Sequence, residues 1–256
     1  MKNAVVAVVG CIIALSASAA IAQDKKQAAM VGPMAVLKQM SDTLGSKAAI
    51  SVTADASFDE KFEGQFVKTS IRYRIDIIRP NHLFFDVVFD DGAKWIGEYD
   101  GNRVRFYKPA VKEYSEIPFK GSLDAAIDYM DDEGLSKTPV NDFLRSNLFD
   151  AIKDGIYDAA SLEDTLDPDK PDKRMQNLLF RSLGTFWQLW VRDDDTALPV
   201  KFNATYASEP GRPQYALAFR NWSFDGNLAD MSSKYAVPSS LEGWKKVDYV
   251  NPINMR

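Results

Sequence analysis

The chain has 256 residues, with 31 Lys and Arg against 36 Asp and Glu, so its formal net charge is −5 at pH 7. A mildly acidic chain without a basic stripe lacks the phosphate-neutralising surface of nucleic-acid-binding proteins, and no nucleic-acid partner is expected. The length suits one large domain with a sizeable core. The single cysteine, Cys11, excludes disulfides and thiol chemistry from the rest of the chain.

The first 22 residues predict a secretory signal peptide. Lys2 gives a positive start, residues 4–15 form an almost unbroken apolar run, and small residues precede an expected cleavage after Ala22. The run is shorter than a membrane span of about 20 residues, so we expect an exported, periplasmic protein that is not an integral membrane protein. The residues around Cys11 loosely resemble a lipobox, which leaves open a lipidated N-terminus there. Residues 23–256 are predicted to form a single domain.

The exported chain begins with helical spacing and continues with strands. Residues 33–44 place apolar side chains three or four apart and predict an amphipathic helix, which Gly45 is expected to end in the left-handed conformation. From 51 to 119 the apolar period falls to two, which indicates antiparallel strands. Turns rich in Gly, Asn, Asp and Pro separate these strands and predict a meander.

Helical spacing returns in an insert at about 121–155. Ser122 is expected to cap one helix that ends before Gly134, and Pro139 to begin a second helix with a broad apolar stripe. Strands then resume. The charged, Pro-rich linker at 161–174 is predicted to be a hydrophilic hairpin tip.

This order predicts a mainly β, α+β fold. The expected architecture is a strongly curved antiparallel sheet that forms an unclosed half-barrel, with helices packed on the concave face as a lid. In F-W-Q-L-W-V-R, alternation turns Trp187 and Leu189 inward and Phe186 and Trp190 outward. Such an interior can enclose an apolar cavity or be solid core. The candidate cavity-lining residues are Phe85, Phe89, Trp95, Phe106, Met130, Phe143, Trp187, Leu189, Phe202, Leu217 and Phe219.

Five short motifs occur together: R-P-N at 79–81, Y-D-G at 99–101, W-Q-L-W at 187–190, Leu-Pro at 198–199 and S-E-P-G-R-P-Q-Y at 208–215. Together they resemble a family of predicted periplasmic proteins that is described only as a domain of unknown function, over about residues 34–225. That family is similar to the LolA, LolB and LppX-type lipoprotein carriers. The resemblance implies an unclosed β-barrel with a helical lid over a cavity for acyl chains. The sequence departs from the family pattern in the linker at 161–174 and at Asn177, where relatives often carry histidine.

Catalytic and metal-binding patterns are weak. The one histidine, His82, lies in an R-P-N-H turn without a G-x-S-x-G serine elsewhere, so no nucleophilic triad is predicted. The carboxylates at 90–91, 131–133 and 193–195 fall at turns or a helix end, which makes a hydrolase the less favoured alternative. The D-P-D-K-P-D sequence at 167–172 lacks the glycine and closing glutamate of calcium loops. No catalytic residue, metal site or cofactor is therefore expected.

The sequence thus favours a non-catalytic periplasmic carrier, expected to be a monomer, for lipid or for the acyl chains of a lipoprotein. The alternative is a lipid-free interaction or envelope-sensor module on the same scaffold. In that case the concave face would be solid core, and the outward aromatics Phe186 and Trp190 would dock an envelope protein. Periodicity does not report which lipid or partner is bound.

Overall fold

The structure is a computed structural model that describes residues 32–135, 138–168 and 170–249. The predicted signal peptide and Cys11 lie outside these residues. Thirteen strands form one sheet in the described part of the chain. The strands are β1 (Ala49–Phe62), β2 (Gln65–Ile78), β3 (His82–Phe89), β4 (Lys94–Tyr99), β5 (Arg103–Lys108), β6 (Glu113–Pro118), β7 (Ile156–Ser161), β8 (Thr165–Asp167), β9 (Lys170–Ser182), β10 (Thr185–Arg192), β11 (Pro199–Tyr206), β12 (Gln214–Ser223) and β13 (Lys245–Lys246).

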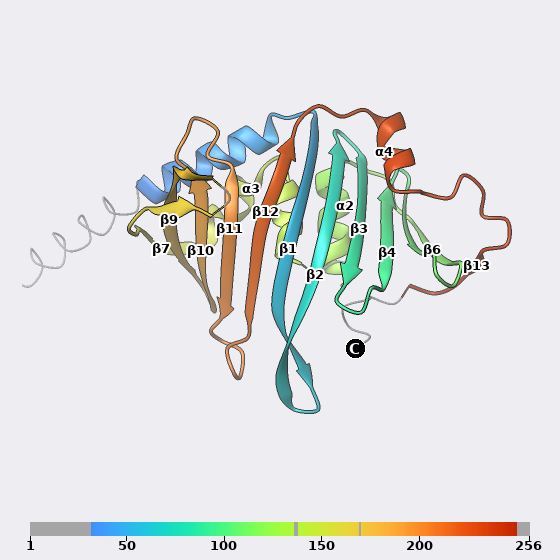
Figure 1. Ribbon diagram of the computed structural model, residues 1–256, viewed down its shortest axis with the longest axis horizontal. Helices are drawn as coiled ribbons and strands as arrows, with labels where there is room; N and C mark the ends of the chain where they lie inside the picture. Colours follow the sequence, from blue (N-terminus) through green and yellow to red (C-terminus); the bar gives the residue numbers. More distant parts are fainter. Residues whose placement is uncertain (1–31, 136–137, 169, 250–256) are drawn as a thin grey trace, which may run out of the picture.

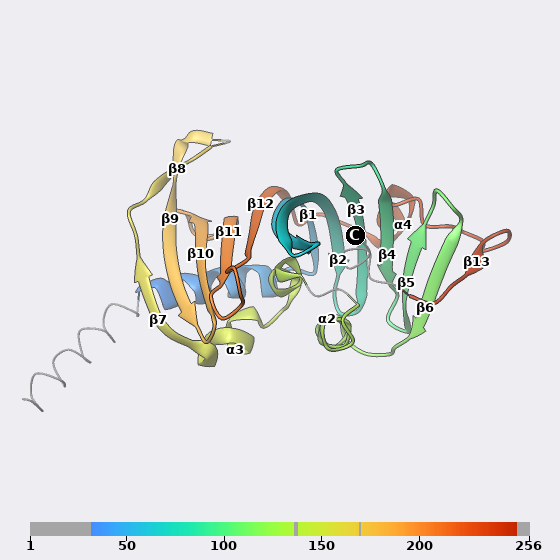
Figure 2. The same cartoon turned by 90° about the horizontal axis from the view of Figure 1, so that it is seen from below.

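The sheet is open and curved, which confirms the predicted half-barrel (Figure 1, Figure 2). Its strand order is β13-β6-β5-β4-β3-β2-β1-β12-β11-β10-β9-β7, and β8 pairs with β9 outside this path. The pairing of β1 with β12 joins the two halves of the chain at the centre. Neighbouring strands are antiparallel except for the short parallel pair of β13 and β6.

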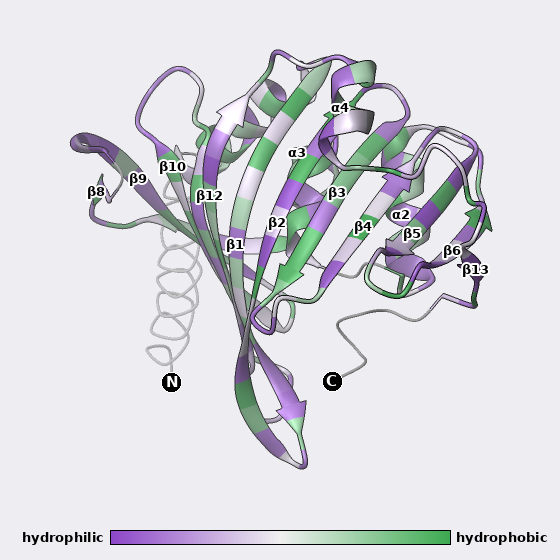
Figure 3. Ribbon diagram, turned by 45° about the vertical axis from the view of Figure 1, so that its right-hand side comes forward, coloured by the Kyte–Doolittle hydropathy of each residue, from purple (hydrophilic) through white to green (hydrophobic). Residues whose placement is uncertain are grey.

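Two-residue alternation gives each strand an inner and an outer face, visible as hydrophilic and hydrophobic bands in Figure 3. In β1, Ala54 and Ala56 are buried, whereas Asp55 between them is partly exposed. In β10, Trp187 and Leu189 belong to the large core cluster and Phe186 on the opposite face is 41% exposed. The inward and outward sets predicted for β10 are therefore confirmed.

The concave face is covered by helices (Figure 2). They are a helix at 32–45, α2 (Leu123–Asp132), the 3-10 helix η1 (Pro139–Leu144), α3 (Leu148–Ile152) and the 3-10 helix η2 (Lys153–Gly155). The N-terminus of α2 is as predicted, because the Ser122 side chain accepts a hydrogen bond of 3.2 Å from the Ala125 N–H. Gly134 follows the helix with a φ of 68°.

The second half of the insert differs from the prediction of one helix beginning at Pro139. The chain instead forms η1, turns extended at Arg145 with a ψ of 147°, and resumes as α3. The Arg145 guanidinium lies 3.2 Å from Asp131 and 3.4 Å from Asp142, and it also pairs with Asp128. Ion pairs with Asp128 and Asp131 of α2 thus hold the chain at the point where the helix is interrupted.

The prediction that Gly45 ends the first helix in the left-handed conformation is wrong. Gly45 lies within the first helix and does not have a positive φ. A Cβ atom at this position would lie 2.3 Å from the carbonyl oxygen of Ser146. Close by, the Phe149 N–H donates a hydrogen bond of 3.0 Å to the Ser41 hydroxyl. Glycine is therefore required because the first helix and the insert meet backbone to backbone.

One helix lies on the other face of the sheet, so the prediction that helices pack on the concave face is incomplete. Helix α4 (Leu228–Lys234) covers the convex side of β3, β4 and β5 (Figure 1, Figure 2). There Met231 and Tyr235 pack in a second, smaller core with Phe84, Ile96 and Tyr107. Seven residues are too few for helical periodicity to be recognised in the sequence.

We expect Gly211→Val, in the loop between β11 and β12, to lower thermal stability with little effect on ligand affinity. Gly211 has a φ of 82°, and a Cβ atom there would lie 2.2 Å from the ring of Phe66. A β-branched residue in this conformation costs on the order of 1–3 kcal/mol before the clash is counted. Thermal denaturation measures the loss.

Gly92→Val is the matched control. Gly92 has a φ of 83° but no atom within 4 Å of its ideal Cβ position, so it isolates the backbone strain from the clash. We expect the Gly92 variant to lose less stability than the Gly211 variant. A larger change in ligand affinity than in stability at Gly211 would instead indicate a binding site in its loop.

Candidate ligand-binding site

Two cavities lie between the concave face of the sheet and the helices. The first has a volume of about 30 Å³, the space of a single water molecule. The second, under the first helix, has a volume of about 240 Å³. Since an apolar cavity of about 150 Å³ can hold a benzene molecule, the second is large enough for an organic guest.

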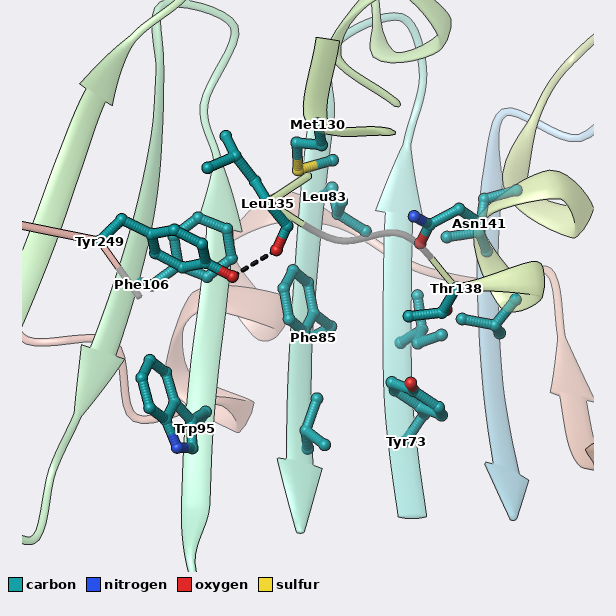
Figure 4. A pocket seen from close by; sticks show the side chains of 14 residues that line it. Tyr73, Leu83, Phe85, Trp95, Phe106, Met130, Leu135, Thr138, Asn141 and Tyr249 are labelled. Atoms are coloured by element: carbon teal, nitrogen blue, oxygen red, sulfur yellow. Dashed lines mark hydrogen bonds between the residues drawn. The ribbon is translucent and has the colours of Figure 1, made fainter. Parts of the chain in front are cut away.

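The first cavity is lined by β2 to β5 and by the insert (Figure 4). Phe85 of β3 pairs across the strands with Gly97 of β4, where a Cβ atom would lie 2.0 Å from the Phe85 ring. The Phe85 ring therefore occupies the space that a side chain at position 97 would fill. Phe106 meets Phe85 edge to face, with the ring centroids 6.1 Å apart.

Tyr249, near the end of the described chain, covers the same cavity. Its ring centroid lies 4.2 Å from that of Phe106, and its hydroxyl donates a hydrogen bond to the carbonyl of Leu135 (Figure 4). Burial raises the pKa of the Tyr249 hydroxyl, which therefore stays protonated and able to donate. A C-terminal segment thus helps to close the interior.

Aromatic side chains form much of the wall of the second cavity. Trp187 stacks on Phe180 with a centroid distance of 4.1 Å. The Trp187 indole N–H donates a hydrogen bond of 3.1 Å to the Ser182 hydroxyl, which satisfies its polar atom. Phe143 of the insert meets Phe202 of β11 edge to face at 5.5 Å. The insert is therefore in direct contact with the aromatic face of the sheet.

The cavity walls carry little charge. Among the described residues, the first cavity is lined by no Asp, Glu, His, Lys or Arg. In the described part of the chain, Asp142 is the one such residue around the second cavity, and burial raises the pKa of its carboxyl despite the neighbouring Arg145. Neither cavity wall therefore presents the pair of acid and base groups that hydrolysis needs.

The structure places the sequence-predicted candidates at three locations. Those on the wall of the first cavity are Phe85, Trp95, Phe106 and Met130. Those on the wall of the second cavity are Phe143, Trp187, Leu189 and Phe202. Those buried in the core without lining either cavity are Phe89, Leu217 and Phe219.

Sequence reasoning missed polar residues in the interior. Tyr73 and Thr138 line the first cavity, and Tyr206 lines the second. The alternation of β2 places Tyr73 on the inner face and could have identified it. No sequence signal places Thr138 or Tyr249 there, because both depend on how separate segments fold over the sheet.

The described ranges, residues 32–135, 138–168 and 170–249, contain neither a metal-binding cluster nor a membrane-spanning helix. No group of three or more His, Cys, Asp or Glu residues in these ranges is arranged to hold a metal ion. No helix in them is both long and apolar enough to cross a membrane. His82 begins β3 and is partly exposed, away from both cavity walls.

These features define a class of protein: an open β half-barrel whose concave face, under helices, holds largely apolar, aromatic-lined cavities. The chain belongs to the family of predicted periplasmic proteins named DUF2092, whose model matches residues 33–242. The family expected from the sequence motifs is therefore confirmed. Among curated proteins, none is similar to this chain.

Several solved structures are similar. Lipoprotein LppX of Mycobacterium tuberculosis aligns with a TM-score of 0.47 and 11% identity, over 77% of this chain and 97% of that chain. LprF from Mycobacterium bovis aligns with a TM-score of 0.45 and 7% identity, over 77% and 95%. The LolA superfamily protein NE2245 from Nitrosomonas europaea aligns with a TM-score of 0.33 and 10% identity, over 77% and 94%.

Proposed function

We propose that this protein is a non-catalytic periplasmic carrier that binds the acyl chains of a lipid or a lipoprotein on the concave face of its sheet. The observation that carries the proposal is the 240 Å³ cavity between the first helix, the insert and β10–β11. Its wall is mainly aromatic and aliphatic, and Asp142 is the one acidic or basic side chain among the described residues that line it. A hydrocarbon chain suits such a wall, whereas a charged ligand would lose its hydration without a compensating partner.

The buried apolar side chains around the cavity support this proposal, because an apolar wall offers water no hydrogen-bond partners. Leu189 is 0% exposed, and Phe202 is 8% exposed, yet both border open space. Empty space beside apolar side chains forfeits dispersion contacts. An acyl chain would restore those contacts and hence gain affinity from the same wall.

Mass spectrometry of an organic extract of the native protein tests the proposal. We expect fatty acyl species in near-stoichiometric amount, and displacement of a bound fluorescent fatty acid by the extracted lipid. A refolded, delipidated sample is the control and should regain the lipid from vesicles. An extract without acyl species, together with no uptake by the delipidated sample, would exclude the carrier.

The lipid-free interaction module is the second candidate, and one observation favours it. Leu183 and Phe186, at the turn and strand of the β9–β10 hairpin, are 95% and 41% exposed, and Tyr157 on neighbouring β7 is 52% exposed. Exposed apolar side chains that lie close together are typical of protein-docking surfaces. Under this alternative, Leu183→Ser would abolish binding of an envelope partner, and the native protein would carry no lipid.

A further inference from the structure

Three hydroxyl groups gather in the interior without conventional hydrogen bonds. They belong to Tyr73 of β2, Tyr215 of β12 and Thr138 at the start of η1, and we call them the hydroxyl triad. Tyr73 is 4% exposed, and Tyr215 and Thr138 are 7% exposed. Within the described residues, none of the three oxygens makes a hydrogen bond of ordinary geometry. Because a buried polar group without a partner costs free energy, such a cluster needs an explanation.

The three hydroxyls lie close to one another although they come from distant segments. Burial raises the pKa of Tyr73, whereas weak side-chain hydrogen bonding with the hydroxyls of Tyr215 and Thr138, outside ordinary geometry, lowers it. Burial also raises the pKa of Tyr215. Figure 4 shows the Tyr73 hydroxyl turned towards Thr138 beside the first cavity. Both tyrosines therefore stay neutral and can act as hydrogen-bond donors.

Thr138 departs from the usual role of its position. It is the N-cap residue of η1, where a threonine hydroxyl ordinarily accepts a hydrogen bond from a backbone N–H of the first turn. Here the Thr138 side chain makes no such bond, and its carbonyl alone accepts from the Asn141 N–H at 3.0 Å. The hydroxyl is thus turned away from the helix that it could cap.

We propose that the hydroxyl triad binds the neutral carbonyl oxygen of an acyl ester whose hydrocarbon part lies along the concave face. This inference rests on the proposed carrier function and names the group of the ligand that it recognises. A carbonyl oxygen has two lone pairs and can accept from two tyrosine hydroxyls at once. The first cavity, which Tyr73 and Thr138 line, has room for one group the size of a water molecule, such as a carbonyl oxygen, and no described residue of its wall is cationic. A neutral carbonyl therefore suits it better than a carboxylate or phosphate.

Matched ligands test this inference. Methyl laurate, dodecyl methyl ether and laurate compete for the protein against the fluorescent probe N-phenyl-1-naphthylamine, which reports occupancy of apolar sites. We expect the ester to bind about tenfold more tightly than the ether, a difference of about 1.4 kcal/mol, because the ether lacks the carbonyl oxygen that accepts the hydrogen bonds. Laurate should bind more weakly than the ester.

Substitution of the two tyrosines distinguishes the contribution of the triad hydroxyls to ligand affinity from that of the apolar cavity wall. In the Tyr73→Phe and Tyr215→Phe double variant, the affinity for the ester should fall to that for the ether, and the affinity for the ether should not change. Equal binding of ester and ether by the native protein would overturn the role of the triad while leaving the carrier intact. Binding of neither ligand would overturn both, and tighter binding of laurate would overturn the choice of a neutral carbonyl.

The melting temperature of the empty protein gives a second, ligand-free test. Because the two hydroxyls have no conventional partner, we expect Tyr73→Phe and Tyr215→Phe to leave it unchanged or to raise it. Tyr99→Phe is the control, since the Tyr99 hydroxyl donates a hydrogen bond of 2.8 Å to the Gly121 carbonyl. The Tyr99 variant should melt lower and keep the preference for the ester. A lower melting temperature in the two triad variants would show that their hydroxyls stabilise the fold, against the proposal.

Discussion

Leu189→Ala is expected to destabilise the protein by about 2–3 kcal/mol and to weaken acyl-chain binding by roughly tenfold. Leu189 is 0% exposed and borders the second cavity. Truncation of a buried leucine in close-packed core costs about 2–5 kcal/mol, and the cost grows with the space left behind. Because open space already lies on one side of Leu189, fewer contacts are lost and the lower end of that range applies. Chemical denaturation and titration of a fluorescent fatty acid measure the two effects.

Gln188→Ala, one residue earlier, is the control. Its side chain points to the convex side and donates a hydrogen bond of 2.7 Å to Asn177. We expect a loss of about 1 kcal/mol or less and unchanged fatty-acid affinity. If Leu189→Ala instead cost more than about 4 kcal/mol with unchanged binding, the aromatic face would be solid core, and the carrier proposal would fail.

Fixing the insert to the sheet is expected to abolish ligand uptake. Ile152 of α3 and Thr185 of β10 line the second cavity, and both are partly exposed. A disulfide-containing crosslinker between cysteines introduced at these two positions would hold the insert over the cavity, so that an acyl chain could not enter. The only natural cysteine is Cys11, which removes competing pairs within the folded domain. Stopped-flow uptake of a fluorescent fatty acid measures the block.

Reduction of the same double variant is the matched control and should restore uptake, because it changes the bond alone. Each single cysteine variant should take up the probe at the native rate. Equal uptake by the crosslinked and reduced forms would show that the insert does not act as a lid. The hinges expected for its opening are Gly121, Gly134 and Gly155, and of these Gly134 has the positive φ that glycine accommodates best.

Local pattern predicted the sheet and the first helix of the insert because both depend on neighbouring residues. Alternation in β10 correctly oriented Trp187 and Leu189, and the Ser122 cap is a contact across three residues. The break at Arg145 could not be predicted in the same way. It depends on carboxylates of α2 that only the folded chain brings beside it.

The candidate site could be predicted only as a set of inward-facing residues. Phe219 and Phe202 both face the helices, yet Phe202 borders a cavity and Phe219 does not. The difference depends on the gap between the sheet and the helices, which a strand's own sequence does not determine. The hydroxyl of Thr138 is a similar case, since its approach to Tyr73 depends on how the insert folds over the sheet.

The contact of Gly45 with Ser146 determines which segments must move together when the second cavity opens. The first helix and the insert are separated by about a hundred residues in sequence but meet without an intervening side chain. The hydrogen bond from the Phe149 N–H to the Ser41 hydroxyl is a second attachment between the insert and the first helix. Opening the second cavity from the α3 side must therefore either carry the first helix along or break both attachments. The substitution Ser41→Ala, which removes the hydroxyl that accepts from Phe149, would then accelerate ligand exchange by weakening the attachment of the insert to the first helix.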